Sequence, residues 1–205
     1  MNDAVVYDVD KDGRQEIILG CNDSPGLYLL NHDGTIRWKN GEVSNSRNVG
    51  GGDINGDGSI EVIATSDAGK ISTFNAKGKL LDSFDPGFYA AFLSLGKFIA
   101  KNKGLEIITS RAEEEKEFLN ILDSKGNPVW KFPLGKAVEA RPAQTSCCLA
   151  RGWLAVGTRD GQIFVFDSKG KVIAYSKDSG KQILVTWTKN EKGEWLLISA
   201  VWKQA

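Results

Sequence analysis

The chain has 205 residues, which is enough for one well-buried domain or two small ones. Lysine plus arginine equals aspartate plus glutamate at 26 each, so no net charge directs it toward nucleic acid or an anionic membrane. A hydrophobic content of 41% with 23 glycines excludes a disordered chain and is typical of a turn-rich β protein, and no apolar run approaches the roughly 20 residues of a membrane helix.

The N-terminus begins with a short strand, predicted at 4–8, without the basic start and apolar centre of a signal peptide. An acidic loop follows, DVDKDGRQE, and leads directly into the β-like segment EIILG. Oxygen-bearing side chains at alternate positions, followed by a glycine, are what a short loop needs to wrap a hard cation. We therefore expect Ca²⁺ to be bound here by Asp8, Asp10, Asp12, the carbonyl of Arg14 and Glu16.

The same loop recurs as DINGDGSIE, whose first aspartate comes 45 positions after Asp8. Its expected ligands are Asp53, Asn55, Asp57, the carbonyl of Ser59 and Glu61. An EF-hand would need a glutamate at the twelfth loop position and a helix on each side. The twelfth residues are Leu19 and Ala64, and both loops run into β-like segments, so the sequence favours strand–loop–strand cation sites.

Four segments of the chain repeat one pattern of apolar runs, a tip, a tight turn and a final short strand. Their turns, NHDG, NAKG, DSKG and DSKG, combine an Asn or Asp with a glycine that supplies positive φ. The turn glycines, Gly34, Gly78, Gly126 and Gly170, are 44, 48 and 44 residues apart. A unit of about 44 residues with four short antiparallel strands predicts a β-propeller blade.

The predicted fold class is therefore an all-β propeller of about four complete blades and a two-stranded partial fifth. The blades are expected at about 4–40, 47–85, 89–133 and 141–176, with the partial one at 181–202. A propeller must close to remove its sheet edges. The chain is thus either a single propeller domain over 1–205 or an excised part of a ring of about 300 residues or more. A compact five-bladed ring, or completion of the ring by a homo-oligomer, also stays open.

The motif D-x-D-x-D-G-x-x-E-I-I-x-G followed by L-Y-x-L-N-x-D-G-x-x-x-W resembles the FG-GAP/VCBS-like calcium-binding propeller repeats. The later half of each unit, as in DSKGNPVW, looks like a pyrroloquinoline-quinone-type propeller repeat. The resemblance covers nearly the whole chain as four repeats, and it implies structural Ca²⁺ held by the alternating acidic side chains of the two loops. The family usually has aspartate as the last ligand, where this chain has Glu16 and Glu61.

The third and fourth blades depart from the motif. Aligned on its glutamate, KFIAKNKGLE keeps Asn102 and Glu106 but places Phe98 and Ala100 at the first two ligand positions, and SCCLARGW keeps nothing. Two metal sites are therefore expected.

If the acidic loops join the first and second strands, they share a face with the tight turns. The opposite face, which usually binds ligands in propellers by resemblance, is expected to present Arg47, Tyr89, Arg141 and Lys181 near the central channel. Such groups could hold a carboxylated sugar or an acidic peptide. The alternative is that they bind loop carbonyls and pack neighbouring blades.

The remaining reactive side chains give little sign of catalysis. Cys147 and Cys148 are adjacent, as in quinone-dependent alcohol dehydrogenases, but are predicted to be buried free thiols on an inner strand. The one histidine, His32, lies in a turn, so no histidine-based triad or metal site can form.

The sequence thus predicts a calcium-stabilised, non-catalytic propeller module that binds a protein or carbohydrate, extracellular or periplasmic, with a cytoplasmic location as the alternative. Two enzyme classes stay open: a domain similar to polysaccharide lyases, and a fragment of a quinone-dependent dehydrogenase.

Overall fold

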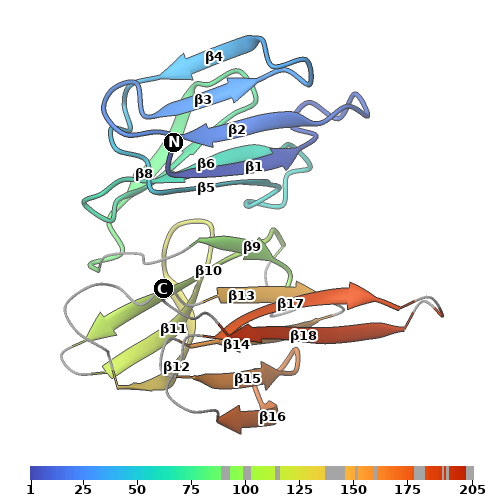
Figure 1. Cartoon of the computed structure of the whole chain (residues 1–205). Helices are drawn as coiled ribbons and strands as arrows, with labels where there is room; N and C mark the ends of the chain where they lie inside the picture. Colours follow the sequence, from blue (N-terminus) through green and yellow to red (C-terminus); the bar gives the residue numbers. More distant parts are fainter. Residues whose placement is uncertain are drawn as a thin grey trace.

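The computed structural model describes residues 1–88, 93–98, 103–113, 116–136, 146–150, 152–158, 161–177, 183–190, 192 and 194–201. Within these ranges every regular element is a strand, and the strands form four antiparallel sheets of four and one of two. This confirms the prediction of four complete blades and a two-stranded fifth. We number the sheets as blades 1 to 5 in chain order (Figure 1).

Each complete blade is a meander in which consecutive strands are neighbours. Blade 1 comprises β1 (Asp3–Tyr7), β2 (Glu16–Gly20), β3 (Leu27–Leu30) and β4 (Ile36–Asn40). Blade 2 comprises β5 (Asn48–Gly52), β6 (Glu61–Thr65), β7 (Ile71–Phe74) and β8 (Leu80–Phe84).

The later blades follow the same order, and in blade 3 the first strand is short and the other three are long. Blade 3 comprises β9 (Ser94–Gly96), β10 (Glu106–Glu113), β11 (Lys116–Leu122) and β12 (Pro128–Lys136). Blade 4 comprises β13 (Ser146–Ala150), β14 (Trp153–Gly157), β15 (Gln162–Phe166) and β16 (Val172–Lys177), and blade 5 comprises β17 (Ile183–Lys189) and β18 (Trp195–Val201).

The tight turns form as their sequences predict. In the β7–β8 turn, Gly78 donates its N–H to the carbonyl of Asn75 at 2.9 Å with a φ of +79°. The Asn75 side chain accepts the N–H groups of Lys77 and Lys79 at 3.0 Å each. The side-chain oxygen thus satisfies two N–H groups of the turn, and glycine avoids the strain of positive φ.

The hydrophobic core lies between the blades rather than inside a single layer. One cluster joins blades 1 and 2 through Ile18, Leu29, Val62 and Phe74, all with no exposed surface. Further clusters join blades 2 and 3, 3 and 4, and 4 and 5. A strand of a blade that lies between two other blades directs its side chains alternately into two such cores. For this reason β6 is buried along its whole length.

A large ring from each outer strand lies on the turn glycine of the next blade. Trp38 lies over Gly78, Phe84 over Gly126 and Trp130 over Gly170, so close that a Cβ on each glycine would collide with the ring. The indole Nε1 of Trp38 also donates to the carbonyl of Ala76 at 3.0 Å. These aromatic residues therefore fill the gaps between blades.

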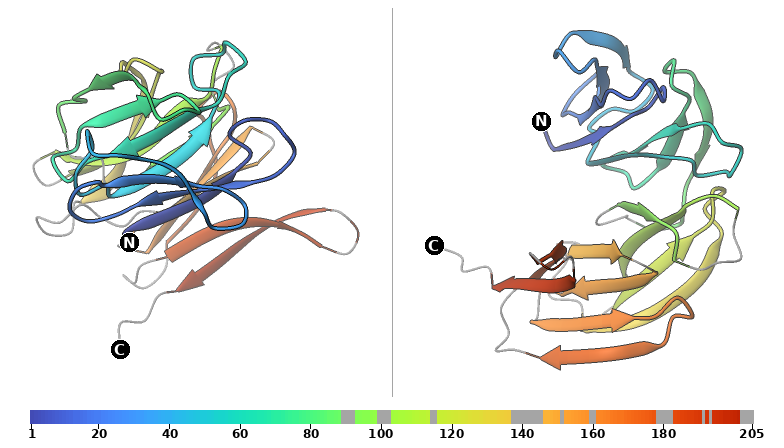
Figure 2. Two further views of the ribbon diagram at one scale, coloured as in Figure 1. Left: turned by 90° about the horizontal axis from the view of Figure 1, so that it is seen from above. Right: turned by 90° about the vertical axis from the view of Figure 1, so that its right-hand side faces the viewer.

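The five sheets follow an arc that does not close (Figure 2). Inner strands β1, β5, β9, β13 and β17 succeed one another along it, and blade 1 and the β17–β18 hairpin form its two ends. No helix in the described ranges is long and apolar enough to cross a membrane.

Candidate cation-binding loops

The loops between β1 and β2 and between β5 and β6 have the same backbone geometry. The first aspartate of each accepts an N–H from the glycine five residues on: Gly13 to Asp8 Oδ2 at 3.0 Å, and Gly58 to Asp53 Oδ2 at 3.1 Å. Both glycines have a φ of +89°. The two loops are therefore copies in structure as well as in sequence.

The alternating side chains shape the loop as well as facing into it. Asp12 Oδ1 accepts the N–H of Arg14 at 2.8 Å, and its counterpart Asp57 accepts that of Ser59 at 2.7 Å. The hydrogen bond from the Ser59 N–H, followed by those from the side chains of Asn55 and Ser59, holds the pKa of Asp57 below its usual value. Arg14 and Ser59 are both exposed at the loop ends.

The glutamate that ends each loop is buried. Glu16 has no exposed surface and Glu61 only 3%, and their Oε2 atoms accept the N–H of Val9 and Ile54 at 2.9 Å each. The glutamate therefore closes the loop back on its own beginning and leaves its other oxygen facing the acidic side chains.

In the first loop the carboxylates come close together. Carboxylate oxygens of Asp8, Asp10 and Glu16 all lie within 4.8 Å of one another. A set made only of oxygen donors suits a hard cation such as Ca²⁺. Three of the predicted ligands of the first loop are thus brought together, and their chemistry fits the ion that the resemblance implies.

Arg37 on β4 is a residue of this site that the sequence reasoning missed. Its Nη1 lies 2.6 Å from Asp10 Oδ2 and its Nη2 3.2 Å from Glu16 Oε1. Asn31 fixes the guanidinium by accepting from Nε at 2.6 Å. The hydrogen bond from Arg37 is the largest of the effects that lower the pKa of Asp10. An arginine three residues after the turn glycine was the available signal.

The second loop has no such arginine. The position of Arg37 is taken in blade 2 by Leu81, and the amide of Asn55 faces the carboxylates instead, donating to Asp57 Oδ2 at 3.0 Å and Glu61 Oε1 at 3.4 Å. Burial, followed by the nearby charges of Asp57 and Asp53, raises the pKa of Glu61. The negative charge of the second loop is therefore offset less strongly than that of the first loop, where Arg37 contacts the carboxylates.

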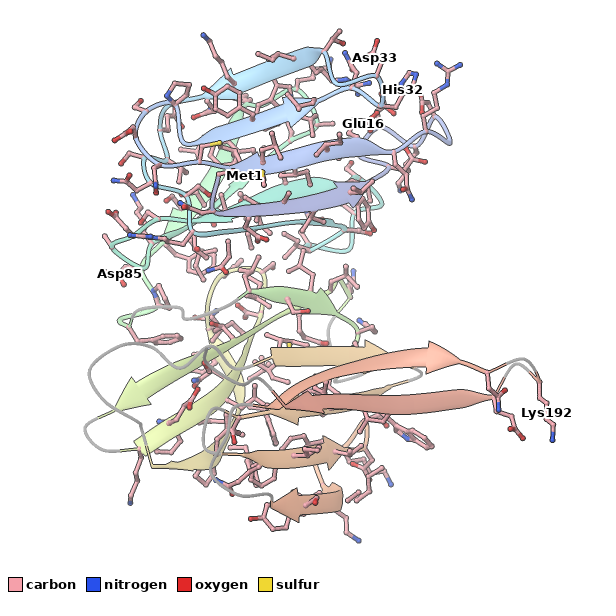
Figure 3. The ribbon with its side chains drawn as sticks, viewed as in Figure 1. Met1, Glu16, His32, Asp33, Asp85 and Lys192 are labelled. Atoms are coloured by element: carbon pink, nitrogen blue, oxygen red, sulfur yellow. The ribbon has the colours of Figure 1, made fainter. Side chains whose placement is uncertain are left out.

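The first loop also reaches the second. Lys11 Nζ donates to the carbonyl of Gly58, and Lys11 adopts a φ of +62° where the second loop has Gly56 at +76°. The two loops and the turn residues Asn75, Ala76 and Lys77 line a groove of about 450 Å³. The cation loops and tight turns therefore share one face, as predicted; Figure 3 shows Glu16 at the same end of blade 1 as His32 and Asp33.

The third loop differs from the sequence alignment. Glu106 is buried and accepts the N–H of Phe98, eight residues earlier instead of seven, so the loop is one residue longer. Phe98 therefore corresponds to Val9 and Ile54, and Lys97, not Phe98, occupies the position of the first aspartate. Placing Phe98 at the first ligand position was wrong, because that alignment assumed equal loop lengths, and Ala100 and Asn102 lie outside the described residues.

The ammonium group of Lys97 binds backbone carbonyls of the third loop. Its Nζ donates to the carbonyls of Gly104 at 3.0 Å and Lys103 at 3.2 Å. Counted back from the glutamate, Gly104 corresponds to Arg14 and Ser59, whose carbonyls are the expected metal ligands. In blade 4, Ala150 pairs with Trp153, so a tight hairpin replaces the loop.

Neighbouring loops are packed tightly together. The N–H of Leu105 donates to the carbonyl of Asp53 at 2.8 Å, and a Cβ on Gly104 would collide with the carbonyl of Ile54. The loop of blade 2 therefore rests directly on that of blade 3.

The predicted ligand-binding residues are only partly placed. Arg47 is exposed immediately before β5, at the end of the strand opposite the second loop. Tyr89, Arg141 and Lys181 lie outside the described residues. Cys147 and Cys21 are both half-buried, Cys21 is a free thiol, and the side chain of Cys148 lies outside the described part.

Residues 8–64, which span both cation loops, match the FG-GAP-like repeat family. No curated protein matches the chain in sequence.

The solved structures that share its fold include the V. cholerae biofilm matrix protein Bap1 (TM-score 0.55, 19% identity), BamB from Moraxella catarrhalis (0.58, 15%) and Raptor from Chaetomium thermophilum (0.63, 13%). The alignments cover 91%, 92% and 97% of this chain but 32%, 54% and 19% of those proteins. The chain thus spans about half or less of each of these three. At these identities the likeness concerns the fold alone, which is of the propeller type.

Proposed function

We propose that this chain is a calcium-stabilised propeller module that binds a partner and performs no catalysis. The observation that carries the proposal is the cluster of Asp8, Asp10 and Glu16 oxygens within 4.8 Å, in a loop that recurs with the same hydrogen bonds 45 residues later. Asp12, Asp53, Asn55, Asp57 and Glu61 complete the side chains that would hold the two ions, with the carbonyls of Arg14 and Ser59.

The role of the ion would be structural. Like charges a few ångströms apart repel, and a divalent cation removes that repulsion while restraining the loop. The loops also contact one another, through Lys11 and Gly58 and through Leu105 and Asp53. Order imposed on one loop would thus stabilise the packing of the next blade.

The test is thermal unfolding with Ca²⁺ and with EGTA. Calcium should raise the melting temperature of the wild-type chain, because an ion that binds only the folded state stabilises it by mass action. Asp10→Ala combined with Asn55→Ala should abolish most of the difference. The control Asp67→Ala removes an exposed carboxylate from the β6–β7 turn and should preserve it. Identical wild-type melting curves in the two buffers would refute calcium stabilisation.

The partner would bind the face opposite the loops, where Arg47 is exposed. A guanidinium suits carboxylates, so polygalacturonate and polyglutamate are suitable probes of an acidic sugar and an acidic peptide. Arg47→Ala should weaken binding of one of them, while Lys39→Ala, exposed on β4, should not. Release of unsaturated uronate products from polygalacturonate would contradict the non-catalytic assignment and favour a lyase.

An extracellular or periplasmic location would suit such loops. Calcium sites of extracellular modules have dissociation constants of about 0.1–1 mM, so external calcium would keep even weak loops loaded. Selective loading at millimolar but not micromolar calcium in a titration would support this placement, and tight binding at micromolar calcium would argue against it.

A further inference from the structure

The sheet of blade 1 has one face that no described residue covers. Val6 and Ile36 are 54% and 60% exposed. The register places Val6 opposite Ile17, Ile17 opposite Leu30 and Leu30 opposite Ile36. These four residues thus form one apolar row across all four strands, which we call the blade 1 row.

The same positions in blade 2 are where blade 1 packs. Counted from the loop glutamates and turn glycines, the counterparts of Val6, Ile17, Leu30 and Ile36 are Gly51, Val62, Phe74 and Leu80. Gly51, Val62 and Phe74 are buried, and Leu80 packs on the cluster between the blades. The blade 1 row therefore has the composition and placement of a surface that receives a preceding blade.

The turn glycines give a second, independent observation. Gly78, Gly126 and Gly170 each have an aromatic ring of the preceding blade on their surface. Gly34 has the same positive φ, +83°, but a Cβ there would meet nothing within 4 Å. Gly34 thus has the backbone conformation of the other turn glycines but no ring packed on it. It lies two residues before Ile36, the last member of the blade 1 row.

We propose that the blade 1 row and Gly34 together dock one further propeller blade, whose outer strand places a Trp or Phe ring over Gly34. Its other contacts would be aliphatic, as in the surface that blade 1 presents to blade 2 through Val5, Ile18 and Leu29. Burial of this row removes exposed apolar surface, which is the main source of stability between the existing blades.

Within the described residues, the free end of a second copy offers no fourth strand to carry the required ring. In blades 1 to 3 the ring comes from the fourth strand, and the described part of blade 5 has only β17 and β18. In blade 4, Ala174 takes the position of Trp38. A complete blade with its own fourth strand supplies such a ring, so we assign the occupant as such a blade, and docking of a second copy is the competing outcome of the test.

The test is a variant in which residues 1–45 are duplicated in tandem before residue 1. The 45-residue spacing of the two acidic loops is then maintained, and the added Trp38 should lie over the original Gly34. The melting temperature should rise by about 4 °C or more. Trp38→Ala in the added copy alone should remove much of the rise, and Gly34→Ala in the original copy should lower the duplicated variant more than the wild-type chain.

Two outcomes would overturn the proposal. One is an added segment that is digested by protease without a change in melting temperature. The other is a wild-type dimer, detected by light scattering, that is dissociated by Val6→Lys combined with Ile36→Lys. The control Leu81→Lys, at an exposed aliphatic residue of blade 2, should leave that dimer intact. This result would assign the face to a second copy. Each measurement is repeated with EGTA, so that a missing calcium effect is distinguished from a missing blade contact.

Discussion

Arg37 and Leu81 occupy the same position in the outer strands of blades 1 and 2, three residues after the turn glycine, but face very different loops. Arg37 contacts Asp10 and Glu16, whereas Leu81 is 50% exposed. In the second loop the carboxylate of Asp57 is bound instead by the amide of Asn55. A guanidinium among the carboxylates competes with any bound cation, because the two cannot neutralise the same charges at once. The two loops should therefore differ in affinity, with the second the stronger.

Arg37→Leu, which copies blade 2, should tighten the weaker of the two calcium-binding steps by about tenfold, equivalent to about 1.4 kcal/mol. Without calcium the same variant should melt lower than wild type, because Asp10 and Glu16 lose their counter-charge. Calorimetric titration checks both steps. The reciprocal Leu81→Arg should weaken the stronger step, and unchanged affinities in both variants would show that Arg37 does not compete.

The two buried glutamates should respond differently to one substitution. Glu16→Gln removes a charge that Arg37 binds, and in EGTA we expect a loss of about 1.5 kcal/mol, the low end of the range for hydrogen bonds to charged groups. Glu61→Gln keeps an oxygen for the N–H of Ile54 while removing a buried charge, so it should be neutral or stabilising in EGTA. Urea unfolding measures both, and equal losses would contradict the difference between the loops.

Glu61 also predicts a pH dependence. Its pKa is raised in the folded chain, chiefly by burial, so the folded state binds more protons than the unfolded state above the ordinary value of 4.5. Stability should therefore fall as pH rises from about 4.5 through the raised pKa. In EGTA, the stability of wild type minus that of Glu61→Gln isolates this component from aspartates such as Asp57, whose lowered pKa has the opposite sign. A flat difference curve would contradict it.

The packing of Trp38 on Gly78 can be tested by comparing alanine substitutions at Gly78 and Gly34. Gly78→Ala combines strain at φ +79° with a Cβ only 2.7 Å from Trp38, whereas Gly34→Ala has similar strain and open space. Positive φ and overpacking each cost about 1–3 kcal/mol, so Gly78→Ala should be more destabilising by about the overpacking part. Denaturant unfolding measures the difference, and equal losses would show that the ring moves aside freely.

Much of the fold is readable from the sequence because each blade repeats a local code. The turn glycines at 34, 78, 126 and 170 and the apolar runs between them specify the strands independently, and the acidic loops mark where β1 meets β2 and β5 meets β6.

The site was less predictable because its counter-charges come from elsewhere in space. Arg37 lies 21 residues after Glu16 and reaches it only because β4 is the outer strand of the same sheet. The third loop was misaligned because it has one additional residue. Its glutamate still accepts a backbone N–H, that of Phe98, as the glutamates of the first two loops do. Spacing from a motif cannot detect such an insertion, whereas the hydrogen bond to the backbone does.

Lys97 gives the final prediction, that the third loop is held by a tethered ammonium and is indifferent to calcium. Its Nζ donates to the Gly104 carbonyl, the counterpart of the carbonyls expected to bind metal in the first two loops. Lys97→Met should lower the melting temperature equally in EGTA and in calcium, because no ion can replace the lost charge in a loop without the acidic ligands. Lys103→Met, the exposed neighbour that contributes only its carbonyl to Lys97, is the control and should melt like wild type. If calcium restored the Lys97→Met variant, the third loop would be a metal site after all, and the lysine a competitor for it in the manner of Arg37.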